Sequence, residues 1–258
     1  MDLSDDQLRR YARNMIMDEV GHDGQARLLD SRVLVVGAGG LGAPVLMYLA
    51  AAGIGTLGIV DHDRVDLSNL QRQIVHATGD IGRPKAVSAA DTLYDINPEV
   101  TVQSHDARLT ADNVAALVAD YDLVVDCCDN FTTRFLVNDA CHFGGKTLVS
   151  GAVMRFDGQV AVYKSHAGSD YPCYRCLVPA PPQQVQTCAD AGVFGAVCGL
   201  VGSLQATEVL KERLGIGETL AGRLLIVDAL YTTVRKVRIP RDPGCALCGD
   251  QPTITGIA

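Results

Sequence analysis

The chain has 258 residues, of which 48% are hydrophobic and 20% charged, proportions that are ordinary for a soluble globular protein. Its net charge of −8 and pI near 5.1 argue against a nucleic acid or an acidic membrane as the main partner. No apolar run reaches the length of a membrane span and no signal-peptide core is present, so we expect a cytoplasmic protein. The nine cysteines, an odd number, argue against a complete disulfide framework and point to metal ligation or thiol chemistry.

The N-terminal thirty residues are predicted to form a helical arm. Ser4 and Gln7 have the spacing of a capping box. Leu8, Tyr11 and Met15 then form an apolar stripe, which predicts a short amphipathic helix.

Strand and helix patterns alternate from residue 31 to about residue 150. Strands are predicted at 33–36, 56–60, 100–103, 122–126 and 147–150, and helices at 43–52, 84–97, 111–120 and 131–144. This alternation is typical of a Rossmann-like, doubly wound sheet with helices on both faces.

The second half, 151–258, has a different pattern. A strand with alternating apolar residues is predicted at 158–163, and a helix rich in small residues at 192–213. Two further strands follow at 224–228 and 232–239, and these we expect to be antiparallel. Because no linker or internal repeat separates the halves, we predict one domain over 1–258, with a mostly parallel sheet and an antiparallel C-terminal part.

A glycine-rich turn follows the first strand of the alternating half. Gly37, Gly39 and Gly42 fit G-x-G-x-x-G, in which backbone N–H groups and a helix N-terminus approach a phosphate closely. Asp61 ends the next strand, where an acid binds ribose hydroxyls. The alternative is a tight turn that merely needs glycine, and the fingerprint alone does not separate NAD from ATP.

The loop after Asp61 is polar and basic. It contains Arg64, Asn69, Gln71 and Arg72, and Lys85 follows it. Cations near these strand ends suit a triphosphate better than the single pyrophosphate of NAD. The alternative is a solvated surface loop.

The stretch "DCCDN" follows the fourth predicted parallel strand. Asp129 is a natural Mg²⁺ ligand there, because strand-end carboxylates face the ligand crevice of such sheets. Asp126 is either a second acid of the site or the cap of the next helix. Cys127 and Cys128 are interpreted as small buried residues.

Two C-x-x-C pairs give the strongest local pattern. Cys173, Cys176, Cys245 and Cys248 supply four thiolates, the ligand set of a closed, structural Zn²⁺ site. Since 68 residues separate the pairs, the metal would clip the C-terminal segment to a distant loop. Redox dithiols are the alternative.

The other cysteines and the histidines give weaker patterns. Cys188 precedes a helix N-terminus, which lowers a thiol pKa, so it is a candidate reactive thiol or else a passive loop residue. Cys141 and Cys198 are predicted in the core. The six histidines form no ligand pattern and are assigned to the surface or to satisfied core positions.

The combination of these motifs resembles the ThiF/MoeB/HesA family of ubiquitin-activating-type adenylyltransferases. The matching stretches include "RYARN", "VLVVGAGGLGAP", "VDHDRVDLSNLQRQ", "IGRPKA", "DCCDN", "PCYRC", "TCADAG" and "PGCALCG", and the resemblance covers nearly the whole chain. It implies ATP-dependent adenylation of the C-terminal Gly-Gly carboxylate of a small ubiquitin-fold sulfur carrier, with release of pyrophosphate.

The resemblance also implies roles for individual residues. Arg72, Lys85 and Mg²⁺ on Asp129 would stabilise the phosphates, and Arg13 would reach the triphosphate of a neighbouring subunit, which implies a homodimer. Cys188 would act in a crossover loop at about 177–191, within a carrier-binding half at 151–258. The implied nucleotide-binding set is Gly37, Gly39, Gly40, Gly42, Asp61, Asp63, Ser68, Asn69, Gln71, Arg72, Lys85, Asp129 and Asn130.

Partners and pathway are less defined. The chain ends ten residues after Cys248 without a rhodanese-like extension, so we expect a separate sulfur donor, either a cysteine desulfurase or a rhodanese. An NAD-dependent oxidoreductase and a non-catalytic scaffold of the same fold are the alternative functions. The sequence does not distinguish molybdopterin, thiamin, cysteine, tRNA-thiolation and natural-product pathways.

Overall fold

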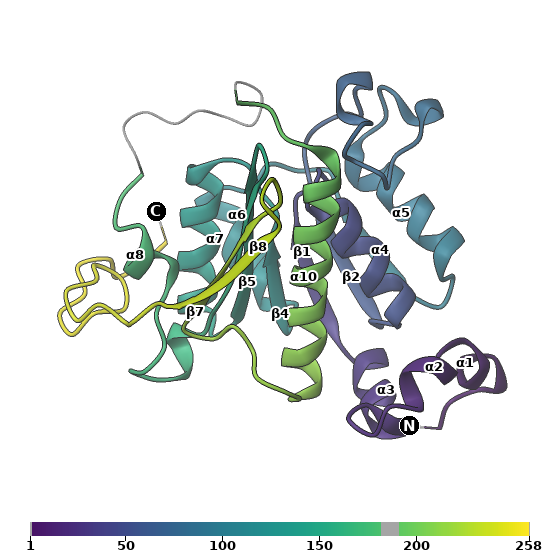
Figure 1. Cartoon of the computed structure of the whole chain (residues 1–258), viewed down its shortest axis with the longest axis horizontal. Coiled ribbons are helices and arrows are strands. Elements are labelled where there is room, and N and C mark those ends of the chain that lie inside the picture. The colour runs from purple at the N-terminus through teal and green to yellow at the C-terminus, as the bar shows by residue number, and fades with distance from the viewer. Residues whose placement is uncertain (1, 182–190, 258) are drawn as a thin grey trace.

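The computed structural model describes residues 2–181 and 191–257, and within them one sheet of eight strands forms the centre of the molecule (Figure 1). The strand order is β3-β2-β1-β4-β5-β6-β7-β8. The first five strands of this order are parallel, and the remaining pairings are antiparallel, which confirms the predicted fold class. The strands are β1 (Arg32–Val36), β2 (Thr56–Val60), β3 (Thr101–His105), β4 (Leu123–Asp126), β5 (Thr147–Met154), β6 (Asp157–Tyr163), β7 (Arg223–Asp228) and β8 (Thr233–Arg238).

Helices cover both faces of the sheet. One face carries α4 (Gly42–Ala52), α5 (Lys85–Ile96) and α10 (Gly195–Leu214), and the other carries α6 (Ala111–Ala119) and α7 (Phe131–Phe143) (Figure 1). Because both faces are covered, the central strands β1 and β4 are continuous apolar runs instead of alternating ones.

The strand order changes direction at β1. The chain runs outward from β1 through β2 to β3, then returns through α6 to place β4 on the other side of β1. Ligands of open α/β sheets bind in the crevice at the carboxyl ends of the strands beside such a reversal. The glycine turn and the loops after β2 and β4 all leave the sheet at this edge.

The N-terminal arm consists of α1 (Asp5–Arg10), α2 (Ala12–Met15) and α3 (Gly21–Leu29). Ser4 caps α1 by accepting a hydrogen bond from the Gln7 N–H at 3.2 Å, as predicted. The prediction that one helix continues past Tyr11 is wrong. The chain turns at Tyr11, whose buried ring packs against Gly53 at the end of α4.

Short elements complete the chain. The loop between β2 and α5 contains the 3₁₀ turns η1 (Leu67–Asn69) and η2 (Thr78–Asp80), and η3 (Ser165–Ala167) and α8 (Tyr174–Leu177) follow β6. The segment after β8 folds beside α8 (Figure 1). Among the described helices, none combines the length and the apolar character needed to cross a lipid bilayer.

Candidate functional site

The glycine turn joins β1 to α4. Gly37 has φ of +95°, a conformation that side chains rarely adopt, and its N–H donates to the Val60 carbonyl of β2. A Cβ on Gly42 would lie 1.8 Å from the Gly37 carbonyl oxygen. The turn therefore needs glycine at both positions, and it brings the N-terminus of α4 to the crevice.

Asp61 connects the end of β2 to the glycine turn. Its two carboxylate oxygens accept hydrogen bonds from the Ala38 and Asp63 N–H groups, both at 2.8 Å. Each oxygen keeps a second lone pair, and these can accept bonds from ribose hydroxyls. The geometry suits the role that the sequence predicts for Asp61.

His76 also supports the glycine turn, and the sequence did not identify it as part of the site. Its buried ring lies between two oxygens, with Nε2 2.9 Å from the Ala38 carbonyl and Nδ1 2.8 Å from Ser88 Oγ. Burial lowers the pKa of His76, so the ring is neutral near pH 7. In the tautomer that satisfies both contacts, Nε2–H donates to Ala38 and Nδ1 accepts from the Ser88 hydroxyl.

Lys85 begins α5 and is held by Asp63. Its side chain is 6% exposed, and its Nζ lies 3.0 Å from Asp63 Oδ2. Partial burial would raise the pKa of Asp63, but the nearby ammonium of Lys85 more than offsets this and lowers it. An antiparallel bridge between their neighbours Arg64 and Pro84 brings Asp63 and Lys85 together.

The remaining predicted residues of this loop differ in their surroundings. Arg72 is half-buried, donates to the Ser68 carbonyl at 3.2 Å and lies against Gly40 of the glycine turn. The Ser68 hydroxyl donates to Asp66 Oδ1 at 2.5 Å and accepts from Asn69 Nδ2, so both belong to a local turn. The structure thus brings Arg72 to the glycine turn and leaves the Gln71 side chain exposed.

The loop after β4 presents Asp129 to solvent. Within residues 2–181 and 191–257, the Asp129 carboxylate has no hydrogen-bond or ion-pair partner, so it is free to bind a cation. Asn130 caps α7, with its Oδ1 accepting from the Thr133 N–H at 2.9 Å. The alternative of Asp126 as the cap of this helix is therefore wrong.

Asp126 is instead a buried anchor. Its carboxylate accepts from Ser150 Oγ at 2.7 Å and lies 3.4 Å from Arg134 Nε. Gln205 of α10 donates to the Asp126 carbonyl from the opposite face at 2.9 Å. The sequence did not point to Arg134 or Gln205. Gln205 lies 79 residues from Asp126, and Arg134 belongs to none of the motifs noted in the sequence.

Arg13 lies on the N-terminal arm, at the end of α4 opposite the glycine turn. The arm packs at the C-terminal end of α4, where Asn97 Nδ2 donates to both the Tyr11 hydroxyl and the Ala50 carbonyl. The glycine turn is at the opposite end of this eleven-residue helix, roughly 16 Å away at 1.5 Å per residue. The exposed Arg13 is therefore not brought to the nucleotide crevice of its own chain.

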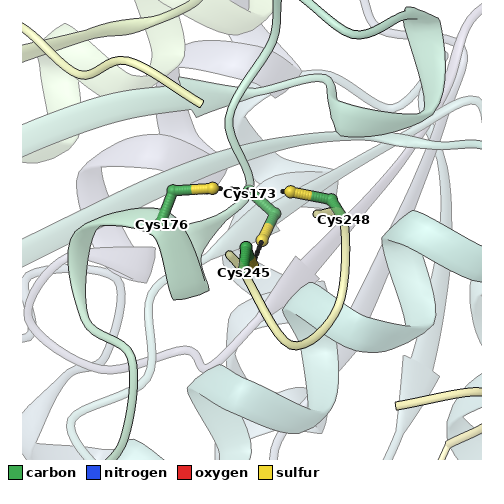
Figure 2. Close-up of side chains that lie close together, drawn as sticks. All are labelled: Cys173, Cys176, Cys245 and Cys248. Carbon is green, nitrogen blue, oxygen red and sulfur yellow. Dashed lines mark hydrogen bonds between the residues drawn. The ribbon is translucent and has the colours of Figure 1, made fainter. Parts of the chain in front are cut away.

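The four predicted zinc ligands converge (Figure 2). Cys173 Sγ lies 3.6 Å from Cys245 Sγ, Cys176 Sγ lies 3.4 Å from Cys248 Sγ, and all four sulfurs lie within 4.8 Å of one another. Tetrahedral Zn²⁺ with bonds near 2.3 Å needs sulfurs about 3.8 Å apart, so this donor set fits the metal. The Asp242 N–H donates to Cys176 Sγ, the kind of outer contact that orients a thiolate ligand.

The other cysteines are placed largely as expected. Cys127, Cys141 and Cys198 are buried, and Cys128 is half-buried beside Asp126. Cys188 lies outside the described residues, so its predicted reactivity stays a prediction.

Comparisons with known proteins agree with these motifs. The model of the ThiF family matches residues 11–247. The sulfur carrier protein adenylyltransferase of Thermus thermophilus is 53% identical over 96% of this chain and 93% of its own length. The SAMP-activating enzyme E1 of Haloferax volcanii is 52% identical over 95% and 90%.

Longer and more distant proteins also match. The adenylyltransferase and sulfurtransferase MOCS3 of Mus musculus is 48% identical, and this chain spans 55% of its length. Among solved structures, E. coli MccB superposes with a TM-score of 0.82 at 21% identity, covering 97% of this chain and 74% of MccB, which shows a shared fold. With a family match over most of its length and relatives more than 50% identical, the chain belongs to the ThiF family.

Proposed function

We propose that the chain adenylates the C-terminal Gly-Gly carboxylate of a small ubiquitin-fold sulfur-carrier protein, using ATP. One observation carries the proposal: the glycine turn, Asp61, Lys85 and the loop of Asp129 all lie at the carboxyl edge of the sheet. Two relatives that match nearly the whole chain are named as a sulfur carrier protein adenylyltransferase and a SAMP-activating enzyme.

The reaction joins two anions, so it depends on positive charge. A carboxylate oxygen of the carrier attacks the α-phosphorus of ATP, the bond from that phosphorus to the bridging oxygen breaks, and pyrophosphate leaves. Arg72 and Lys85 lie where they can stabilise the charge that develops on the phosphates. Asp61 holds the ribose, and the α4 N-terminus contacts the phosphates through its N–H groups.

Asp129 is the proposed protein ligand of Mg²⁺. Its exposed, unpartnered carboxylate suits a cation that is usually held by one or two carboxylates together with substrate phosphates. When bound, Mg²⁺ neutralises phosphate charge in this type of chemistry. Zn²⁺ on the four cysteines has a structural role, because all four coordination positions are taken by thiolates.

A homodimer would complete each site. Arg13 is too far from the crevice of its own chain, and it would instead reach the triphosphate of a second subunit. Large exposed apolar side chains on the arm and on the outer sides of α4 and α5 support an interface between copies; they are Ile16, Met17, Tyr48 and Tyr94.

The carrier would bind the 151–258 half, with Cys188 in the crossover loop available for sulfur transfer. The name of MOCS3 joins adenylyltransferase and sulfurtransferase, which indicates that sulfur transfer accompanies adenylation in that protein. For this chain we expect a separate cysteine desulfurase or rhodanese as donor. The reaction belongs in the cytoplasm, where thiols stay reduced.

The test is isotope exchange between pyrophosphate and ATP with candidate carriers ending in Gly-Gly. We expect exchange that requires a carrier and is lost when its last two glycines are deleted. A folded, zinc-loaded protein that shows no exchange with any candidate, but binds NAD saturably, would support the oxidoreductase alternative instead.

A further inference from the structure

The two residues between Cys173 and Cys176 do more than space the ligands. The Tyr174 N–H donates to Asn138 Oδ1 of α7 at 2.7 Å, and the buried Tyr174 ring packs edge-on against Phe135. Arg175 forms a two-point pair with Asp139 of α7, at 2.8 and 2.7 Å. The cysteine loop, residues 173–176, is therefore held against α7 by contacts of both intervening residues.

α7 begins at the loop that carries Asp129. Arg134, in the first turns of this helix, donates from Nη2 to the Cys128 carbonyl at 2.8 Å and to the Gly151 carbonyl at 2.9 Å. Its Nε lies 3.4 Å from the fully buried Asp126 carboxylate. One guanidinium thus holds the backbone of the residue immediately before Asp129 against β4 and β5.

Tyr174 connects the cysteine loop to this guanidinium. The Arg134 guanidinium carbon lies 5.7 Å from the centre of the Tyr174 ring, within the range of a cation–π contact. The contact covers the side chain of Arg134, which is 11% exposed, and limits the directions in which its N–H groups can point. A continuous set of contacts therefore runs from the cysteine loop through Tyr174 and Arg134 to the Asp129 loop.

We propose that Arg134, oriented by Tyr174, is a positioning residue that fixes the Cys128–Asn130 segment for Mg²⁺·ATP binding. This rests on the proposed function of Asp129. We assign Arg134 to positioning because its Nη2 donates to two backbone carbonyls and its Nε faces Asp126, which leaves the side chain largely buried. Lysine at this position would keep the charge but lose the planar fork that serves these acceptors together.

The test compares Arg134→Lys with Arg175→Lys in the full-length, zinc-loaded protein. Arg134 belongs to α7 and Arg175 pairs with Asp139 of the same helix, but of the two only Arg134 contacts the Asp129 loop. We expect Arg134→Lys to raise the Mg²⁺ concentration needed for half-maximal ATP binding roughly 10- to 100-fold, as for residues that orient a metal ligand. Amide hydrogen exchange at residues 127–131 should quicken in the same variant. Arg175→Lys should change neither quantity.

A second pair of variants keeps the proposal testable if Arg134→Lys folds poorly. Tyr174→Leu should shift the Mg²⁺ dependence in the same direction, and Tyr174→Phe, which keeps the ring, should restore it. Unchanged Mg²⁺ dependence and unchanged exchange at residues 127–131 in both Arg134→Lys and Tyr174→Leu would overturn the proposal. Neither the Mg²⁺ dependence of ATP binding nor amide exchange needs a carrier protein, so both test the role of Arg134 independently of adenylation. Failure of the adenylation hypothesis would look different: the wild-type protein would bind Mg²⁺·ATP but show no pyrophosphate exchange.

Discussion

Three carboxylates lie at or near the carboxyl ends of the central strands, and their partners assign them different tasks. Asp126 is buried, with Oδ2 held by Ser150 and Arg134 and Oδ1 held by Cys128, so its role is structural. Asp61 accepts one backbone N–H from the glycine turn and one from its own loop after β2. Only Asp129, among these three, is exposed and unpartnered in the described structure, so it is the one available to a cation.

The first prediction concerns that difference. Asp129→Asn should reduce ATP–pyrophosphate exchange by at least about a hundredfold, the scale seen when one group that stabilises transition-state charge is removed. Its stability should stay within about 0.5 kcal/mol of the wild type, because the side chain is exposed and unpartnered. Asp95→Asn, a matched change at an exposed acid on α5, should leave exchange intact. Normal exchange in Asp129→Asn would remove Asp129 from the metal site.

His76 gives a prediction about pH. Burial lowers its pKa below the ordinary value of 6.5, so the unfolded chain binds a proton more readily than the folded one. The stability contributed by the neutral ring is thus present above about pH 6.5 and falls as the pH drops below it. Burial similarly lowers the pKa of His142 and His166.

The variant His76→Gln isolates the share of His76. It should cost about 1–3 kcal/mol at pH 8 through imperfect replacement of two buried hydrogen bonds. The loss of stability between pH 8 and pH 5 should become smaller than in the wild type, while His142 and His166 still contribute in the same direction. Denaturant unfolding at both pH values measures this, and an unchanged difference would show that His76 does not titrate on unfolding.

At the scale of elements, the predictable part of the structure rests on local pattern. The strands and helices of the parallel half follow from apolar runs and caps, and the four zinc ligands follow from their spacing. Arg134, His76 and Gln205 were not predictable as parts of the site. Gln205, for example, meets Asp126 across 79 residues, a contact that only packing of α10 on the sheet creates. The break at Tyr11 has the same origin, because burial against α4 outweighed the local helical pattern.

The four-cysteine zinc site, which joins α8 to the segment after β8, gives a prediction at the scale of elements. Cys176→Ser should lose Zn²⁺, and the melting temperature should fall on the order of 10 °C, because loss of a structural metal is among the largest single-residue effects. Metal analysis and thermal denaturation measure the two outcomes. Cys141→Ser, at a buried cysteine away from the cluster, should keep the full zinc content. Unchanged metal content in Cys176→Ser would contradict the four-cysteine site.

At the scale of the whole molecule, the arm and the crevice lie at opposite ends of α4, so the proposed role of Arg13 would require a second chain. Arg13→Ala and Asp129→Asn should each be inactive alone. Mixed in equal amounts and reassociated, the two variants should form mixed dimers as about half of all dimers. Each mixed two-fold dimer contains one intact site of two, so about a quarter of wild-type exchange should return. Mixing that gives no recovery would show that Arg13 does not act across an interface.

The most direct test of the central claim is the intact mass of the carrier after incubation with the enzyme, Mg²⁺ and ATP. We predict a carrier that has gained AMP on its C-terminal glycine, and that loses it again when pyrophosphate is added. Arg72→Ala should yield little adduct, and a carrier without its last two residues should yield none. A carrier whose mass stays unchanged under conditions where the wild-type enzyme is folded and binds ATP would contradict the account.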